Sequence, residues 1–238
     1  MSEPGLDVPD GPVLGVWAHP DDETYLCGGL MARAVRNGSR VVCVTATRGE
    51  LGSPDEKRWP PGPPLAVIRT TEMEQALAAL GVTEHEWLDY PDGHCAEIND
   101  GQAVNVLTRI MEGVRPDTVL TFGPDGMTGH PDHISVSRWT TAAHAEAAPD
   151  ALLAYATNTP DWLERFRPGL DKVGAFMGAE PPCTPVDQLV IHGVFEGDLL
   201  EAKLNAIRCQ TSQVEPLVAV LGESFLREGL AEESFRSP

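Results

Sequence analysis

Short runs of apolar and β-branched residues alternate along this chain with longer segments in which apolar residues recur every three or four positions. The first run covers residues 13–18, and the segment after it carries Leu26, Leu30 and Ala34 at helical spacing before Asn37-Gly38 ends it. By the same criteria, strands are predicted at 40–46, 86–90, 117–122, 152–156 and 188–192, and helices at 66–80, 101–114, about 131–147 and 198–209. This alternation predicts an α/β fold with a parallel sheet covered by helices on both faces.

Two segments do not follow the alternation. Residues 53–64 contain five prolines and are expected to form a stiff loop after the second strand. Residues 160–185 are interrupted by proline and glycine, and their pattern predicts no regular element. The length of 238 residues is most simply that of a single domain, 1–238.

Composition indicates which partners are disfavoured and in which compartment the protein is expected. The chain has 17 Lys and Arg against 36 Asp and Glu, so its acidic surface disfavours nucleic acid and anionic membranes. Its first ten residues are polar and acidic, unlike a signal peptide, and no apolar run is long enough to span a bilayer. The five cysteines are scattered without a CxxC pair, which indicates reduced thiols and a cytoplasmic location.

Two dense clusters of polar residues come directly after predicted strands. Ala-His-Pro-Asp-Asp-Glu occupies 18–23, after the first strand, and Gly-His-Pro-Asp-His occupies 129–133, after the strand at 117–122. Each cluster also begins a helix. Because ligands of open parallel sheets bind beyond the carboxyl ends of the strands, we expect the two clusters to meet at one edge.

The residue types in these clusters favour a catalytic metal. His19 and Asp22 are spaced to chelate one ion, and His133 is the expected third ligand, which leaves a position for water. Asp21, between the chelating residues, is then free to act as general base on that water. Two histidines and one aspartate suit Zn²⁺, and Fe²⁺ equally well.

The second cluster offers further catalytic groups. His130 is expected across the site, where it would stabilise an oxyanion or protonate a leaving amine. Asp132 would hold His130 in the required tautomer, although a helix-capping role alone also explains an aspartate there. Either cluster by itself is equally well explained as a capped turn, and the metal site is favoured because both occur at strand ends.

These motifs resemble those of the LmbE-like, or PIG-L, family of zinc-dependent N-acetylglucosamine deacetylases. Further similarity lies at Thr47-Arg48-Gly49-Glu50, at Tyr90-Pro91-Asp92-Gly93 and in the segment 203–213. The resemblance covers about residues 13–213 and leaves 214–238 as a C-terminal tail. It implies a Rossmann-like α/β fold, with a mostly parallel sheet flanked by helices on both faces.

The resemblance also implies a role for individual residues. Carried over position by position, it makes His19, Asp22 and His133 metal ligands, Asp21 the general base, His130 and Asp132 the assisting pair, and Arg48 and Asp92 contacts to the sugar. Arg48 is otherwise a solvated loop arginine, and Asp92 otherwise a turn residue. Thr128 stands where some relatives have tyrosine, so the role of that phenol does not carry over. His94 follows Asp92 in the same loop and is a weaker candidate for a substrate contact.

The leading hypothesis is a metal-dependent hydrolase that removes the acetyl group from an N-acetylglucosamine-containing small molecule. An amidase of the same family that cleaves a larger thiol-sugar conjugate is a neighbouring alternative. A non-catalytic nucleotide-binding Rossmann domain using Gly28-Gly29 is an alternative from another class, although no G-x-G-x-x-G follows the first strand. The oligomeric state is left open by the sequence, although a homo-oligomer is compatible with the resemblance because relatives are commonly oligomeric. The loop at 53–64 is expected to border the site and influence substrate choice.

Overall fold

Five parallel strands and two further strands form one sheet in the computed structural model, which describes residues 10–238. The strand order is β3-β2-β1-β4-β5-β7-β6, and β7 is antiparallel to both of its neighbours. The strands are β1 (Val13–Trp17), β2 (Val41–Thr47), β3 (Glu84–Tyr90), β4 (Thr118–Phe122), β5 (Leu152–Thr157), β6 (Leu189–Val194) and β7 (Glu232–Arg236). The α/β fold with a mostly parallel sheet is therefore confirmed.

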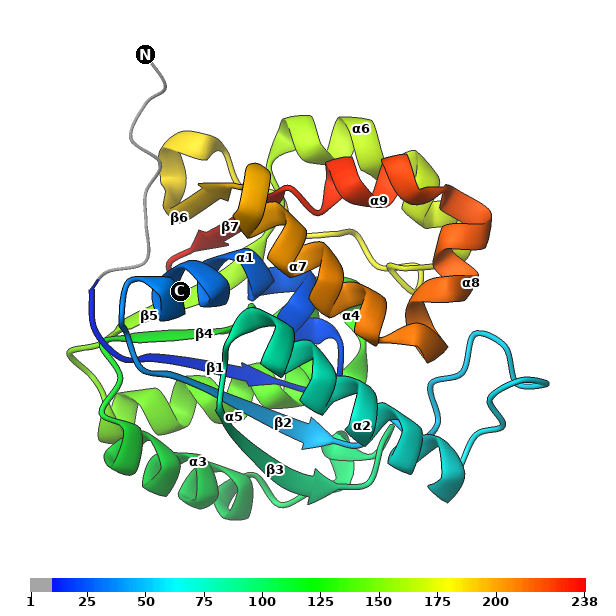
Figure 1. The fold of residues 1–238 in the computed structure, drawn as a ribbon. Coiled ribbons are helices and arrows are strands. Elements are labelled where there is room, and N and C mark those ends of the chain that lie inside the picture. Colours follow the sequence, from blue (N-terminus) through cyan, green and yellow to red (C-terminus); the bar gives the residue numbers. More distant parts are fainter. Residues whose placement is uncertain (1–9) are drawn as a thin grey trace.

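Helices cover both faces of this sheet (Figure 1). On one face lie α1 (Asp22–Arg36), α2 (Pro63–Leu80) and α7 (Gly197–Cys209), and on the other α3 (Asp100–Val114) and α5 (Pro131–Ala147). The short α4 (Gly126–Gly129) precedes α5, and α6 (Pro160–Leu170), α8 (Thr211–Leu221) and α9 (Glu223–Gly229) lie together beyond the end of the sheet where the parallel strands finish. The central strands β1, β2 and β4 are buried along their whole length, as expected for a sheet that is covered twice.

Three segments differ from the sequence-based expectation. The segment 160–185, for which no element was predicted, contains α6. The proline-rich loop ends earlier than expected, because Pro63 and Pro64 form the first turn of α2, where a missing N–H is tolerated. Residues 214–238, expected as a tail, form most of α8, all of α9 and strand β7, which pairs with β5 and β6 inside the sheet.

The sequence of β7, Glu-Glu-Ser-Phe-Arg, explains why it was not predicted. It contains a single apolar residue, yet its three central residues are buried. The charge of Glu233 is compensated by Lys203 of α7, at 2.7 Å, and both side chains are completely buried. A strand of this kind depends on a partner that is distant in sequence, so an apolar pattern does not reveal it.

The side chains of the same ion pair form hydrogen bonds with backbone groups at a break in α1. The helix is interrupted at Cys27, whose φ and ψ are −145° and 17°. The backbone carbonyl of Tyr25 accepts a hydrogen bond from Lys203 Nζ at 2.9 Å. The N–H groups of residues 29 and 30 donate to the carboxylate of Glu233 at 2.7 and 2.9 Å. Backbone groups at the break therefore have side-chain partners, which a buried helix requires.

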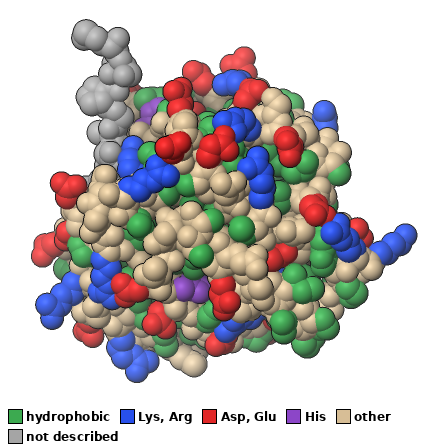
Figure 2. Space-filling model, in the orientation of Figure 1, with side chains coloured by type: hydrophobic (Ala, Val, Ile, Leu, Met, Phe, Trp, Pro, Cys, Tyr) green, Lys and Arg blue, Asp and Glu red, His purple; other side chains and the backbone are tan. Residues whose placement is uncertain are grey.

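Acidic and basic side chains are interspersed on the face of the molecule shown in Figure 2. Among residues 10–238, no helix is both long enough and apolar enough to cross a membrane.

We predict that Lys203→Met destabilises the protein by about 3–5 kcal/mol, because it leaves the buried Glu233 carboxylate without its counter-ion. Urea denaturation measures the free energy of unfolding. Arg40→Met is the matched control: Arg40 pairs with Glu84 at 2.6 Å, but both side chains are more than 40% exposed, so the expected loss is under about 1 kcal/mol. The double variant Lys203→Met/Glu233→Gln should lose less than Lys203→Met alone, and an equal loss would contradict the electrostatic explanation.

Candidate metal centre and active site

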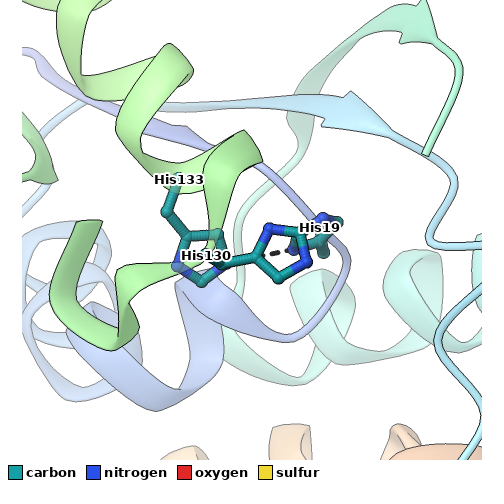
Figure 3. A group of neighbouring side chains, drawn as sticks. All are labelled: His19, His130 and His133. Atoms are coloured by element: carbon teal, nitrogen blue, oxygen red, sulfur yellow. Dashed lines mark hydrogen bonds between the residues drawn. The ribbon is translucent and has the colours of Figure 1, made fainter. Parts of the chain in front are cut away.

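The ends of β1 and β4 bring three histidines together. These strands are parallel neighbours, with Val13 opposite Thr118 and Gly15 opposite Leu120. His19 lies in the turn after β1, whereas His130 and His133 come from the junction of α4 and α5 (Figure 3). The centroids of the three imidazole rings are 4.7 to 5.1 Å apart. The expected meeting of the two clusters at one sheet edge is therefore observed.

The turn that carries His19 is held by Asp22. One carboxylate oxygen, Oδ2, accepts hydrogen bonds from the backbone N–H groups of His19, at 2.8 Å, and of Ala18, at 3.2 Å. On the other side of the site, the His133 ring stacks on Phe122, the last residue of β4, with the centroids 4.1 Å apart and the planes 12° from parallel. Both histidines are thus positioned by the ends of the strands that precede them.

The two facing histidine nitrogens and the two carboxylate oxygens of Asp22 are separated by distances that suit one metal ion. His19 Nδ1 lies 3.1 Å from His133 Nε2. Asp22 Oδ1 is 3.5 Å from His133 Nε2, and Asp22 Oδ2 is 3.7 Å from His19 Nδ1. Tetrahedral zinc with ligand bonds of about 2.0–2.1 Å requires ligand atoms roughly 3.4 Å apart.

In both histidine rings the nitrogen that points away from the other ring bonds to the protein, so that His19 Nδ1 and His133 Nε2 face each other. His133 Nδ1 lies 2.9 Å from the carbonyl oxygen of Gly126 and therefore donates to it, which leaves the lone pair on Nε2. His19 Nε2 lies 3.1 Å from Asp92 and 3.2 Å from Asp132, so it donates to carboxylate and leaves Nδ1 as the ligand atom. A carboxylate that orients a ligand histidine from behind is a regular feature of metal sites. The residues present therefore fit a divalent metal.

Other groups of donor atoms lie within 4.8 Å of one another: His130 with His19 and His133, and Asp92 and Asp132 with His19. The second group lies at Nε2 of His19, on the opposite side of the ring from His133. The carboxylate oxygens of Asp132 already accept hydrogen bonds from the backbone N–H groups of residues 93 and 95, at 2.7 and 3.0 Å. His19, Asp22 and His133 differ from both groups, because the facing nitrogens of His19 and His133 have only each other as hydrogen-bond partners among the described residues.

His130 differs from the other two histidines. Its Nδ1 accepts a hydrogen bond from the backbone N–H of Asp132 at 3.1 Å, so the neutral ring carries its proton on Nε2. Burial, together with the charge of His19, lowers the pKa of His130 below its usual value. A neutral ring with Nε2–H as a donor matches the expected role in stabilising an oxyanion.

The expected contact between the Asp132 carboxylate and His130 is replaced by a different one. His130 is the N-cap residue of α5, and its ring folds over the backbone N–H of Asp132. The Asp132 side chain instead lies against His19 and the backbone at 93–95. The backbone of Asp132 therefore orients His130, while its carboxylate orients His19.

Asp21 occupies a strained position beside the metal ligands. Its φ of 105° is rarely adopted by a residue other than glycine. The buried Arg69 side chain donates to Asp21 Oδ2 at 3.2 Å, to the carbonyl of Gly49 at 2.9 Å and to that of Pro20. Burial raises the pKa of Asp21 to about 7, against the lowering effect of Arg69. The Asp21 carboxylate is thus able to accept a proton near neutral pH.

The pKa values of the two histidines that are expected as ligands shift in opposite directions. Burial lowers the pKa of His133 to about 4, so this ring is neutral at physiological pH, as metal binding requires. Burial also lowers the pKa of His19, but the hydrogen bonds to Asp132 and Asp92 outweigh it and raise the pKa to about 10. A metal therefore competes with a proton for His19.

The two residues expected to contact sugar lie in different surroundings. Asp92 is buried, and its carboxylate contacts His19 and the backbone N–H of Leu51, at 2.8 Å. Arg48 pairs with Asp89 at 2.7 Å, and its guanidinium lies 3.9 Å from the ring centroid of Trp87. The structure thus brings Asp92 into the histidine cluster, whereas the described contacts of Arg48 lie elsewhere. Sugar binding by these residues stays a prediction.

The remaining candidates make different contacts, and the expectation that the loop at 53–64 borders the site stays a prediction. Thr128 Oγ1 is 3.3 Å from His133 Nδ1, so it contacts a ligand histidine although it cannot supply a phenol. His94 is exposed and pairs with Glu97 at 2.9 Å. The loop at 53–64 is attached to α8 by the ion pair between Arg58 and Glu215.

Arg69 was not predicted as a site residue, although a sequence signal for it exists. The buried face of α2 consists of Leu65, Arg69, Glu72, Met73, Ala76, Leu77 and Leu80. An arginine within an otherwise mostly apolar helix face needs buried acceptors. Here those acceptors are Asp21 and two backbone carbonyls.

Comparison with known proteins agrees with the geometry. The family model described as PIG-L, GlcNAc-PI de-N-acetylase, matches residues 14–144. The chain belongs to the PIG-L family. The resemblance found in the sequence motifs is thereby confirmed.

Two relatives and one solved structure are similar over most of the chain. The 1D-myo-inositol 2-acetamido-2-deoxy-alpha-D-glucopyranoside deacetylase of Mycobacterium sp. (strain KMS) is 32% identical over 243 residues, which cover 89% of this chain and 76% of the relative. The protein of the same name from Thermobifida fusca (strain YX) is 34% identical, with 94% and 90% covered. The N,N'-diacetylchitobiose deacetylase from Pyrococcus horikoshii superposes with a TM-score of 0.62 at 26% identity, with 94% and 82% covered.

We predict that His133→Ala removes the metal from the purified protein, because it deletes a ligand whose Nε2 faces His19 and Asp22. Elemental analysis after dialysis measures the metal content. His130→Ala is the matched control and should retain the metal, since His130 lies outside the expected ligand set. Equal metal loss in both variants would show that His130 is also a ligand.

Asp132→Asn should weaken metal binding by about 10- to 100-fold, because the carboxylate that orients His19 loses its charge. Competition with a chromophoric chelator measures the affinity. Glu97→Gln, an exposed change in the neighbouring loop, serves as control and should leave the affinity unchanged. Unaltered metal affinity in Asp132→Asn would mean that the contact with His19 does not support the metal.

Proposed function

We propose that this chain is a metal-dependent N-deacetylase that removes the acetyl group from an N-acetylglucosamine-containing small molecule. The observation that carries the proposal is the group formed by His19, Asp22 and His133, with Asp21 next to Asp22 in the same turn and paired with Arg69. The relatives are named as deacetylases of acetamido sugars, which supports the same reaction.

The proposed ligands are His19 Nδ1, His133 Nε2 and the Asp22 carboxylate, and Zn²⁺ is the proposed metal. Fe²⁺ suits the same donors, since two imidazoles and one carboxylate accommodate both ions. A metal at this position supplies Lewis acidity, which polarises the amide carbonyl and activates water.

The residues of the chain perform the proton transfers. Asp21 accepts a proton from the attacking water, and Arg69 keeps its carboxylate in place during the transfer. His130 Nε2–H donates a hydrogen bond to the negative charge that develops on the carbonyl oxygen. The proton held by Asp21 then passes to the sugar nitrogen, so that acetate and the free amine are the products.

The alternative of a nucleotide-binding domain is less well supported. Gly28 and Gly29, on which it rests, pack against other parts of the protein. A Cβ on Gly29 would lie 2.7 Å from the ring of Phe195, and one on Gly28 would lie 3.2 Å from Lys203. Close packing therefore explains both glycines. The cytoplasmic location and a homo-oligomer stay predictions.

The test is Asp21→Asn. We expect this variant to retain its metal and to lose about 100- to 10,000-fold in kcat, because the group that accepts the proton is removed. Amine release from methyl N-acetylglucosaminide measures turnover, and elemental analysis measures the metal. Asp150→Asn is the control: Asp150 is exposed in the turn before β5, at the end of the sheet away from the histidines, so turnover should not change by more than about twofold. Undiminished turnover in Asp21→Asn would refute the assignment of the base.

A further inference from the structure

A cavity of about 190 Å³ lies among α6, α8, α9 and the sheet. Most of its wall is apolar and comes from the C-terminal half of the chain. Examples are Trp162 and Leu170 of α6, Leu217 of α8, Phe225 of α9 and Phe176. The reaction proposed above uses none of these residues.

The cavity adjoins the metal centre through both histidine-containing segments. Met127 and Thr128, which lie just before His130, line it, and Thr128 also contacts His133. Tyr25 and Leu26 line it as well, in the first turns of α1 after Asp22. Segments that hold the metal ligands therefore continue into the wall of the cavity.

Nearly all polar groups of the wall already have partners, with one exception. The Glu233 carboxylate is used by Lys203 and by the break in α1, and Glu232 accepts a hydrogen bond from Thr159 at 2.7 Å. The hydroxyl of Tyr25 is buried and has no hydrogen-bond partner among the described residues. Because this hydroxyl is covered on all sides, the polar atoms of the wall are either paired or enclosed, and the open space of the cavity is mainly apolar.

We propose that this cavity binds an apolar group of the amino-sugar substrate, either an aliphatic or aromatic aglycone or an acyl chain on the nitrogen. The proposal rests on the proposed function, because it deepens the substrate class of the same site. Apolar cavities of about 150 Å³ accept benzene, so this one is large enough for a ring or for a chain of about six carbons.

Two pairs of substrates test whether the protein prefers a substrate with a larger apolar group. They also show whether that group is the aglycone or the acyl chain. The aglycone pair is methyl and phenyl N-acetyl-β-glucosaminide, and the acyl pair is N-acetyl- and N-hexanoylglucosamine. We expect kcat/KM to be at least about tenfold higher for the apolar member of one pair, mainly through a lower KM, because apolar surface leaves water. The pair that shows the preference identifies which end of the substrate enters the cavity. Equal kcat/KM within both pairs would overturn the proposal.

Variants locate the preference in the cavity. Leu217→Trp fills the cavity from α8 and should abolish the preference while leaving kcat/KM for the less apolar substrate within about twofold. Val220→Trp, on the same helix but 61% exposed and outside the cavity wall, should retain the preference. Ala175→Phe fills the cavity from a loop and replaces Leu217→Trp if that variant does not fold. A preference that survives in a folded filling variant would place the apolar group elsewhere.

Binding without turnover separates this proposal from the proposed function. Hexyl β-D-glucoside has no amide, and calorimetry on the metal-loaded protein measures its Kd. We expect binding to the wild type and at least about tenfold weaker binding to the filling variant. If that result is obtained but no N-acylglucosamine compound is hydrolysed, the proposed function fails and the cavity remains a binding site for apolar groups. Equal binding to both proteins, or none to the wild type, would overturn the cavity proposal.

Discussion

The parallel register between β1 and β4 is the constraint on which the candidate site depends. The two strands are hydrogen-bonded neighbours, and the hydroxyl of Thr121 also donates to the carbonyl of Val16 at 2.9 Å. The rings of Trp17 and Phe122, the last residues of these strands, are in edge contact with their centroids 5.1 Å apart. A shift of the register by two residues would move one cluster by about 7 Å relative to the other. The metal ligands would then no longer meet.

Carboxylates control the electrostatics of the site in three different ways. Asp22 holds the turn and faces the histidine nitrogens. Asp92 and Asp132 lie behind His19 and determine its tautomer, and hydrogen bonds to His19 and to backbone N–H groups hold their pKa values below the usual range although burial opposes this. Asp21 faces Arg69, and burial keeps its pKa near neutrality. Carboxylates of one chemical type thus acquire different roles because their hydrogen-bond partners differ.

The C-terminal segment connects the site to the cavity beside it. Glu233 of β7 and Lys203 of α7 satisfy the broken backbone of α1, a few residues after Asp22. The break ends the first turns of α1 near Tyr25, whose side chain forms part of the cavity wall. The same region of α1 therefore begins with a metal ligand and continues as a boundary of the cavity. Residues 214–238 are in this way part of the environment of the site.

The sequence by itself determined the buried strands, the two clusters that follow them and the identity of the candidate ligands. Those features depend on apolar runs and on residue types within a few positions of one another, and β1, β4 and their following histidines are examples. The tertiary structure decided which way the side chains point. Asp132 faces His19 instead of His130, and Arg69 reaches Asp21, because the partners come from separate segments of the chain. It also decided that the charged strand β7 is buried, since the counter-ion of Glu233 lies on α7. Local pattern cannot supply such partners, and the free energy of a buried charge depends on them.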